Sequence, residues 1–197
     1  FELADRDRNP VLILADGVIG TMMEPVELPE MMSDEEIAAI RESKKKWACI
    51  GHPLDYAHRA WIQPGQWDTN KMQAVNEEAL RLYNSWEKDV MVEEYCTEDA
   101  EVVITAYGIS GRIAKSVVEM MRAEGKKVGL IRPITVHPFP KASFEKLDYG
   151  TCRAILDVEM SIPAQLAEDV DHAVRGRCPI KTCLCSGGNI MSREAVV

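Results

Sequence analysis

The stretch from residue 101 to residue 134 limits the possible folds more than any other part of this sequence. EVVITAY (101–107) is rich in β-forming residues, and SGRIAKSVVEMMRAEG (110–125), which follows a Gly-containing turn, has apolar residues at helical spacing. Gly125 stands just past the end of that helix, where glycine is favoured, and KVGLIRPI (127–134) is a second apolar run. A strand–helix–strand unit of this kind places two parallel strands in one sheet. We therefore expect an α/β fold built on a mostly parallel sheet.

The same alternation continues to the end of the chain. RAILDVEM (153–160) and PIKTCLCS (179–186) are predicted strands, and PAQLAEDVDHAVRG (163–176) is a predicted helix with Pro163 in its first turn. The segment RPITVHPFP is expected to be a strand followed by an extended segment packed at an interface. The second half of the chain is thus predicted to be a single domain, a small α/β sandwich.

The first half is less regular. PVLILAD (10–16) is a continuous apolar run, which is typical of a buried parallel strand. Ser33 and Glu36 are spaced as a capping box at the start of a short helix. This helix opens an irregular stretch (35–68) that we expect to be an arm or connector. Residues 70 to about 94 carry apolar side chains at three- and four-residue steps, which predicts one long amphipathic helix. Its acidic end is expected to be a solvent-exposed face at a domain boundary.

Composition and charge exclude several classes of protein. With 46% hydrophobic and 28% charged residues, the chain is expected to be globular rather than disordered. A formal net charge of −9 argues against nucleic-acid binding, which needs a positive surface. No apolar run approaches the roughly 20 residues needed to cross a bilayer, and the charged start FELADRDRNP is no signal peptide. We expect a cytoplasmic protein with no nucleic-acid or membrane partner. Because the chain does not start with Met, we also expect a fragment of a larger protein.

Cysteine and histidine spacing predicts no metal or cluster site. No two cysteines have the CxxC spacing of zinc and iron–sulfur sites, and no two histidines have HExxH spacing. Cys183 and Cys185 are expected on one face of a strand. We interpret all of them as reduced packing cysteines and as surface or core histidines. The cysteines are Cys49, Cys96, Cys152, Cys178, Cys183 and Cys185, and the histidines are His52, His58, His137 and His172.

The turn YGISGR (107–112) is the first candidate for a ligand site. Gly108 suits a tight turn, Ser110 is expected to cap the following helix, and Gly111 would let another backbone come close. Free amides at the helix start, helped by Arg112, would favour an anion. The turn nevertheless lacks the GxGxxG pattern, the phosphate-loop lysine, the nucleophile elbow and a ribose-binding acid. Two interpretations stay open: a structural turn, and an anion contact made by Ser110, Gly111 and Arg112.

Two acids near the first apolar run are further candidates. Asp16 follows the predicted strand, at the end where ligands bind in open α/β sheets, but Asp-Gly is also an ordinary turn. Glu24 lies eight residues further on, between prolines and methionines. We interpret Asp16 as a structural turn residue, with a position facing an active site or an interface as the alternative. Glu24 is interpreted as an interface or structural residue, with a position facing an active site as the alternative. No residue is predicted to be catalytic or to bind a metal.

Three stretches together are more specific than any single motif. They resemble the α subunit of 2-oxoacid:ferredoxin oxidoreductases, and the likeness is closest to the 2-ketoisovalerate (3-methyl-2-oxobutanoate) type. It extends over the whole chain and is weakest at 35–70 and after 178. The stretches are NPVLILADGVIGTMMEPVELPE, YCTEDAEVVITAYGISGRIAKSVVEMMRAEGKKVGLIRPITVHPFP and AILDVEMSIPAQLAEDVDHAV.

The resemblance implies two domains. Residues 1–95 would be the C-terminal part of a pyrimidine-type thiamin diphosphate domain with a connector arm and long helix. Residues 96–197 would resemble the C-terminal domain of transketolase. In the family, the complete enzyme decarboxylates a 2-oxoacid on thiamin diphosphate, passes electrons through iron–sulfur clusters to ferredoxin, and transfers the acyl group to coenzyme A.

The resemblance also implies what this chain does within such an enzyme. Thiamin diphosphate, Mg²⁺, the iron–sulfur clusters and coenzyme A would be held by the complete enzyme, and this chain by itself would bind no cofactor. Its partners would be a thiamin diphosphate β subunit, a γ subunit, a ferredoxin-like δ subunit and ferredoxin. We therefore expect an interface-forming part of a hetero-oligomeric oxidoreductase that is inactive alone.

Two other functions stay open at this point. One is a non-catalytic regulatory α/β domain in which YGISGR holds a small anion. The other is the β subunit of a 2-oxoacid dehydrogenase complex, which has the same two-domain organisation.

Overall fold

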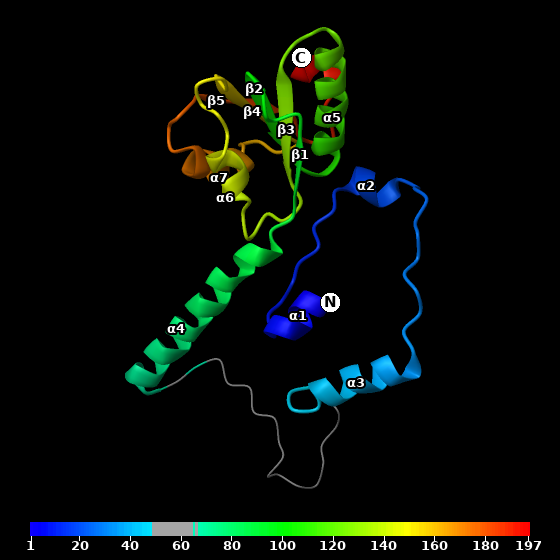
Figure 1. Ribbon diagram of the computed structural model, residues 1–197, viewed down its shortest axis with the longest axis vertical. Helices are drawn as coiled ribbons and strands as arrows, with labels where there is room; N and C mark the ends of the chain where they lie inside the picture. Colours follow the sequence, from blue (N-terminus) through cyan, green and yellow to red (C-terminus); the bar gives the residue numbers. More distant parts are fainter. Residues whose placement is uncertain (49–64, 66) are drawn as a thin grey trace. The chain divides into compact units, whose positions relative to one another are not determined.

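The computed structural model describes residues 1–48, 65 and 67–197, and the chain divides into two compact units. The first unit combines Phe1–Met22 with Asn84–Val197, and the second is Met23–Tyr83 (Figure 1). The first unit carries a five-stranded sheet with helices packed on it, so the predicted α/β class is confirmed. No helix in the described ranges is long and apolar enough to span a membrane.

The sheet has the strand order β1-β3-β2-β4-β5. The central strand β2 pairs in parallel with β3 and with β4, and β4 pairs in parallel with β5. Only β1 is antiparallel, on the edge beside β3, so the expected mostly parallel sheet is confirmed. The strands are β1 (Val92–Tyr95), β2 (Val102–Ala106), β3 (Val128–Pro133), β4 (Ala154–Glu159) and β5 (Ile180–Leu184).

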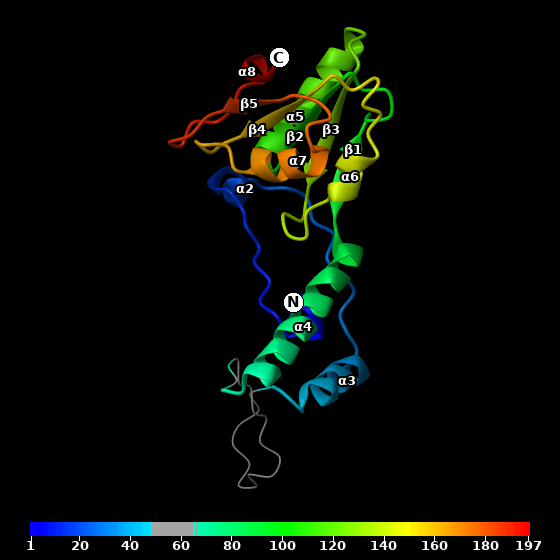
Figure 2. The ribbon, with the colours of Figure 1, turned by 90° about the vertical axis from the view of Figure 1, so that its left-hand side faces the viewer.

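Helices cover both faces of this sheet, so each face has its own apolar core. One face packs against α5 (Gly108–Ala123) and the short α8 (Arg193–Val196). The other face packs against α6 (Lys141–Glu145) and α7 (Leu166–Val174), and Figure 2 shows the two helix layers on opposite sides. This two-sided cover explains why the strands are apolar without alternation.

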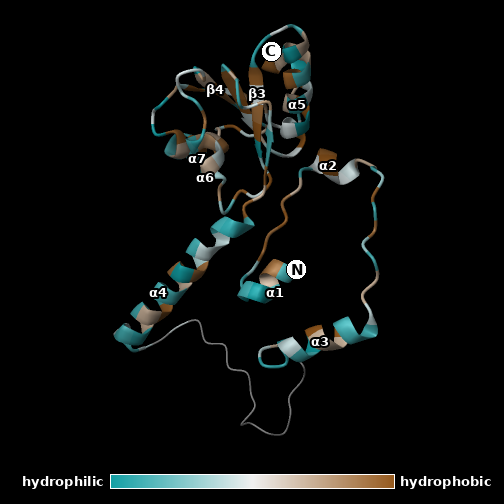
Figure 3. Cartoon of the chain, in the orientation of Figure 1, coloured by the Kyte–Doolittle hydropathy of each residue, from teal (hydrophilic) through white to brown (hydrophobic). Residues whose placement is uncertain are grey.

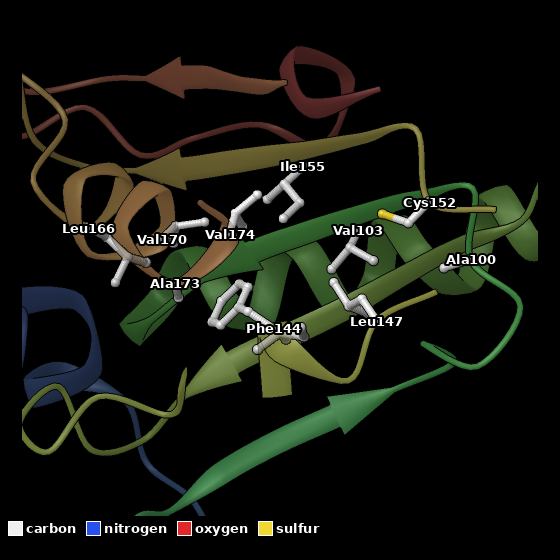
Figure 4. Packing of buried hydrophobic residues seen from close by; sticks show 11 residues of the cluster. Ala100, Val103, Phe144, Leu147, Cys152, Ile155, Leu166, Val170, Ala173 and Val174 are labelled. Atoms are coloured by element: carbon white, nitrogen blue, oxygen red, sulfur yellow. The ribbon is translucent and has the colours of Figure 1, made fainter. Parts of the chain in front are cut away.

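Phe144 is the largest buried side chain of the α6–α7 face. It is fully buried and stacks on Phe139, with ring centroids 5.4 Å apart. Val103 from β2 and Ile155 from β4 point toward the same cluster, and Val170 of α7 lies at its α7 side (Figure 4). Strand alternation puts these two β-branched residues on one face, which is the face that the two helices cover.

The helix predicted between the first two strands of the βαβ unit is confirmed as α5. Gly125 follows α5 with φ of 81°, the left-handed conformation that favours glycine after a helix. Cys183 and Cys185 both pack against the α5 face, as the strand alternation predicts.

The run PVLILAD (10–16) is not a strand, which corrects the prediction. None of the sheet strands in the described part of the chain includes or pairs with it, and Leu12, Ile13 and Leu14 are 83%, 87% and 81% exposed. Figure 3 shows this hydrophobic segment between α1 (Glu2–Asp7) and α2 (Gly17–Thr21). An apolar run becomes a strand only where a neighbouring strand supplies hydrogen bonds, and here none does.

The long helix predicted at 70 to about 94 is shorter than expected. Helix α4 (Thr69–Ser85) ends in a 3-10 turn, η2 (Trp86–Asp89), and the chain then forms the edge strand β1. Residues 92–95 leave the helix because β3 offers them a row of backbone partners, from Val92 opposite Pro133 to Tyr95 opposite Leu130. Pairing with a distant strand outweighed the local helical periodicity.

Other differences concern shorter elements. Helices α6 and α8 were not predicted, and α7 begins at Leu166, after Pro163 rather than with it. In the second unit, the predicted helix is α3 (Asp34–Lys44). Its capping box is confirmed, since the Ser33 hydroxyl accepts the Glu36 N–H while the Glu36 carboxylate accepts the Ser33 N–H at 2.8 Å. The rest of the predicted irregular arm, with Cys49, His52 and His58, lies mostly outside the described residues.

Candidate functional site

The carboxyl ends of β2 and β4 carry most of the buried polar groups of the first unit, including Thr105, Asp157 and Glu159. In parallel sheets this edge is where ligands and catalytic groups usually lie. Two clusters occur there: the Asp16 carboxylate at the start of α5, and a group of acids and hydroxyls between β4 and α7.

Asp16 joins two helix starts with one carboxylate. Its Oδ1 accepts the Ile19 N–H at 2.8 Å, which caps α2. Its Oδ2 accepts the Ile109 N–H at 3.0 Å, which is the first turn of α5. Helix α5 begins after Tyr107, which makes no side-chain cap, so Asp16 supplies a cap from far away in the sequence.

This contact explains the glycine at the start of the turn. Gly108 has φ of 57°, and a Cβ there would lie 2.8 Å from Asp16 Oδ2. Burial opposes ionisation of Asp16, but the amide hydrogen bonds from Ile19 and Ile109 outweigh it and lower the pKa of this carboxyl. The Asp16 carboxylate therefore already accepts the Ile109 N–H, which is the amide that an external anion would use.

The structure places Ser110 and Gly111, two of the three residues predicted for an anion contact, in different environments from those expected. Ser110 is buried inside the first turn of α5 and does not cap it, because the helix starts two residues earlier. Gly111 makes room for a side chain rather than a backbone, since a Cβ would lie 2.9 Å from the Arg132 side chain. Arg112 is half-buried on α5. The anion contact stays a prediction for these residues.

Glu24 and Asp16 belong to different units of the chain. Glu24 is exposed and lies in the second unit, whereas Asp16 lies in the first. A role for Glu24 at an active site or interface therefore stays a prediction.

Glu159, at the end of β4, is the most highly bonded acid of the domain. Its side chain is fully buried, and its Oε1 accepts the Gln165 and Leu166 N–H groups at 2.8 Å and the Ala167 N–H at 3.4 Å. Its Oε2 accepts the Ser161 hydroxyl at 2.8 Å and the Tyr107 hydroxyl at 3.3 Å. A carboxylate at the start of α7 satisfies amides that have no partner in the helix.

Asp157 lies two residues earlier on the same face of β4. It is fully buried, and its register partner on β2 is Thr105, which is fully buried too. Neither oxygen of Asp157, nor the Thr105 hydroxyl, has a hydrogen-bond partner among the described residues. Burial, and then the neighbouring Glu159 carboxyl, raise the pKa of Asp157 to about 8.

Neither buried acid was among the residues predicted from the sequence. A signal was present, because RAILDVEM carries Asp157 and Glu159 at alternate positions of an otherwise apolar strand. Alternation places both acids on one face of a strand that the parallel topology buries. The predicted fold was sufficient to locate them.

The acidic run around residue 93 is not a purely solvated face, which corrects a further expectation. Glu93 in β1 pairs with Lys115 of α5 at 2.5 Å and with Arg132 of β3 at 3.0 Å, and Glu94 pairs with Lys146. The hydrogen bond from Lys115 is the main cause that lowers the pKa of Glu93. These ion pairs tie the edge strand to the domain.

The described residues do not fit a metal or a cluster. No three His, Cys, Asp or Glu side chains in the described ranges gather closely enough to hold a metal ion. The five described cysteines are free thiols, two of which, Cys152 and Cys178, belong to the α6–α7 core. The start of α5, the one turn predicted to hold an anion, is bonded to Asp16.

Comparison with known proteins identifies the domain. The family model described as pyruvate:ferredoxin oxidoreductase core domain II matches residues 100–196. Residues 100–196 are therefore similar to core domain II of that family. The match begins just before β2 and ends in α8, so it covers four of the five strands of the sheet described above.

The chain as a whole is homologous to subunits of 2-oxoacid:ferredoxin oxidoreductases. It is 40% identical over 198 residues to the ketoisovalerate oxidoreductase subunit VorB of Methanothermobacter marburgensis, covering 100% of this chain and 53% of that subunit. VorB of Methanothermobacter thermautotrophicus is 38% identical with the same coverage. The 2-oxoglutarate synthase subunit KorA of M. marburgensis is 25% identical over 222 residues, covering 57% of its length. The resemblance predicted from the three stretches is confirmed, and the chain spans about half the length of these curated relatives.

A solved structure supports the fold. A 2-oxoglutarate:ferredoxin oxidoreductase from Magnetococcus marinus, with 2-oxoglutarate, coenzyme A and succinyl-CoA bound, matches with a TM-score of 0.54. The match covers 67% of this chain and 23% of that one, at 20% identity. At this identity the likeness concerns the fold alone.

Proposed function

We propose that this chain is part of the α-type subunit of a 2-oxoacid:ferredoxin oxidoreductase that acts on a branched-chain 2-oxoacid. The complete enzyme would decarboxylate 3-methyl-2-oxobutanoate, reduce ferredoxin and release the acyl-CoA. The observation that carries the proposal is the 40% identity to VorB over the whole chain. Relatives named KorA and PorA are less similar, which favours the ketoisovalerate type over the 2-oxoglutarate and pyruvate types.

Within that enzyme we propose a structural and interface-forming role for this chain. Residues 1–95 would complete a pyrimidine-type thiamin diphosphate domain with its connector, and 96–197 would dock beside it. The exposed run around Leu12, Ile13 and Leu14 supports this, because three neighbouring apolar side chains more than 80% exposed favour burial against other protein. The partners would be a thiamin diphosphate subunit, a γ subunit, a ferredoxin-like subunit and ferredoxin.

We assign no step of the reaction to the described residues. The buried acids Asp157 and Glu159 face the core of the domain, and Asp16 caps two helices. Thiamin diphosphate, Mg²⁺ and the iron–sulfur clusters would be held elsewhere in the complete enzyme, because the described side chains provide neither a metal-ligand cluster nor a free phosphate turn.

The test uses the full-length subunit with an affinity tag, purified from cells that express its natural partners. We expect the thiamin diphosphate subunit and the ferredoxin-like subunit to co-purify, as identified by mass spectrometry. The complex should reduce a viologen dye only when both 3-methyl-2-oxobutanoate and coenzyme A are present, and faster than with pyruvate or 2-oxoglutarate. Absence of both partners and of activity would overturn the proposal. Faster reduction with pyruvate would overturn the substrate class alone.

The small-anion alternative has its own test. Titration of the chain with inorganic phosphate should leave the amide resonances of Ile109 and Gly111 unmoved, because Asp16 already occupies the Ile109 amide. Saturable shifts of these resonances would favour the regulatory anion-binding domain instead. The relatives favour the oxidoreductase over the β subunit of a dehydrogenase complex, since VorB, KorA and PorA are all named as subunits of 2-oxoacid oxidoreductases or synthases.

A further inference from the structure

The buried acids Asp157 and Glu159 present a problem of charge. Both side chains are 0% exposed, and they lie on the same face of β4, beneath α7. Two ionised carboxylates in one apolar interior repel each other and lose their hydration, so a folded domain must neutralise at least one of them.

The hydrogen bonds decide which acid keeps its charge. Glu159 accepts five hydrogen bonds, three from amides at the start of α7 and two from the hydroxyls of Ser161 and Tyr107. A proton on Glu159 would take an acceptor position from these donors. Asp157 has the opposite surroundings, because no donor among the described residues reaches either of its oxygens.

A proton on Asp157 satisfies both groups at once. Two carboxylates are acceptors only, whereas a carboxylic acid donates to a neighbouring carboxylate. We propose that Asp157 and Glu159 share a single proton in the folded domain, carried by Asp157 and donated to the Glu159 carboxylate. This proposal rests on the surroundings of the two acids alone and does not depend on the proposed function.

The electrostatics of the pair agree with this assignment. Burial, followed by the neighbouring Glu159 carboxyl, raises the pKa of Asp157 to about 8. Burial opposes ionisation of Glu159 as well, but the neighbouring Asp157 side chain, the Ser161 hydroxyl and the amides at the start of α7 outweigh it and lower the pKa of Glu159. The pKa values of the two acids therefore shift in opposite directions, as expected for two like charges that share a site.

The groups around the pair provide no competing charge. From the end of β2, Tyr107 faces it, and burial and then the Glu159 charge raise the pKa of this hydroxyl, so it stays neutral. From β5 the residue paired with Asp157 is Thr182, and α7 contributes backbone amides; neither titrates. The main causes of the pKa shifts of the two acids include no lysine, arginine or histidine.

The proton makes folding depend on pH with a defined sign. The folded pKa of Asp157 is raised above the ordinary value of about 3.9, so the folded chain binds a proton that the unfolded chain has released. Its stabilisation is fully present below about pH 4 and is lost as the pH rises through about 8. Between these limits the contribution of Asp157 to the folding constant falls up to tenfold per pH unit, about 1.4 kcal/mol.

The experiment compares urea unfolding of the full chain with that of D157N, from about pH 5 to about pH 9. The amide keeps the donor of the protonated acid and does not titrate. We expect the folding constant of the variant relative to the natural chain to rise several-fold for each pH unit up to about 8 and then to level off. D148N is the matched control, because Asp148 is exposed and its pKa is lowered, so its ratio should stay constant over this range. A constant ratio for D157N would overturn the proposal.

A second measurement keeps the test independent of how the variant folds. The carboxyl carbon resonance of Asp157 in the natural chain, observed by 13C NMR, should titrate near pH 8 while that of Glu159 stays ionised down to acid pH. A resonance of Asp157 that titrates only below about pH 5 would overturn the shared proton. A proton on the other acid would appear as a Glu159 titration near neutral pH, and would overturn it as well.

Discussion

Replacing Asp16 by alanine tests whether this acid is a structural cap rather than a group held ready for a ligand. The change removes both hydrogen bonds of the carboxylate, to the Ile19 N–H at 2.8 Å and to the Ile109 N–H at 3.0 Å. It leaves the backbone of Gly108 and the rest of α5 in place. If Asp16 is a structural cap, the D16A variant should be less stable than the natural chain. If Asp16 serves to bind a ligand, the variant should be equally or more stable, because functional acids often lower the stability of the folded protein.

The magnitude follows from the two contacts. Loss of the side-chain cap of α2 costs about 1 kcal/mol. Loss of a carboxylate bond to the α5 amide costs about 1.5 kcal/mol, the lower end for hydrogen bonds to charged groups, because Asp16 is half-buried. The free energy of unfolding should therefore fall by about 2.5 kcal/mol, which for a chain of this size lowers Tm by about 5 to 10 °C.

The assay is urea and thermal unfolding followed by circular dichroism. D16N keeps one acceptor oxygen, so its free energy of unfolding should fall by about half as much as that of D16A. E30A, which removes an exposed acid in the second unit, should leave the unfolding free energy within about 0.5 kcal/mol of the natural chain. The pKa of Asp16 is lowered, so its stabilisation is present above about pH 4 and is lost as the pH falls through the folded pKa. The difference between D16A and the natural chain should accordingly shrink in acid.

One result would refute this reasoning. If D16A unfolds within about 0.5 kcal/mol of the natural chain at neutral pH, the two hydrogen bonds contribute nothing and Asp16 is free to serve another role. Equal losses in D16A and E30A would instead show that the loss does not come from the two hydrogen bonds of Asp16.

The remaining predictions concern the core and the cysteines. F144A should lower the free energy of unfolding by about 3 to 5 kcal/mol, measured in urea, because Phe144 is fully buried and stacked on Phe139. G129A should cost about 1 to 3 kcal/mol in the same assay, because the new Cβ would lie 2.6 Å from the backbone oxygen of Cys96, which has little freedom to move. Cys152 should be alkylated by iodoacetamide more slowly than any other described cysteine, as read by peptide mass spectrometry, because it is 2% exposed and burial raises its pKa to about 11.

Each of these predictions has a control within the chain. F1A removes an exposed ring, and G17A adds a methyl group where nothing lies within 4 Å, so neither should lower stability by more than about 0.5 kcal/mol. Cys185 is half-buried and should be alkylated by iodoacetamide while Cys152 is still unmodified. A destabilisation by F1A as large as that by F144A, or equal alkylation of the two cysteines, would contradict the packing described for the α6–α7 face.

Local chemistry explains which elements could be predicted. The helix of the βαβ unit, its Gly125 end and the Ser33 capping box depend on residues within one or two turns of each other. The parallel arrangement of β2, β3 and β4 follows from the alternation of strands with a helix between them. These features were predictable because each is stabilised mainly by its own sequence neighbours.

The two largest errors in the predicted secondary structure occur where a distant strand decides the outcome. Residues 92–95 continue a helical pattern but form β1, because β3 pairs with them across the edge of the sheet. The run at 10–16 is as apolar as a buried strand but stays unpaired, because strand formation needs a neighbour and not only composition.

The candidate sites also combine features that local sequence determines with features that only the tertiary structure determines. The sequence by itself determined that a turn with free amides opens α5, and that acids stand at alternate positions of β4, because turn chemistry and strand alternation are local properties. Only the tertiary structure decided that Asp16, 93 residues away, bonds to the Ile109 amide of that turn, and that Glu159 accepts the amides of α7 while Asp157 has no donor. Hydrogen-bond partners and burial depend on which segments the fold brings together, and the spacing of residues along the chain does not contain that information.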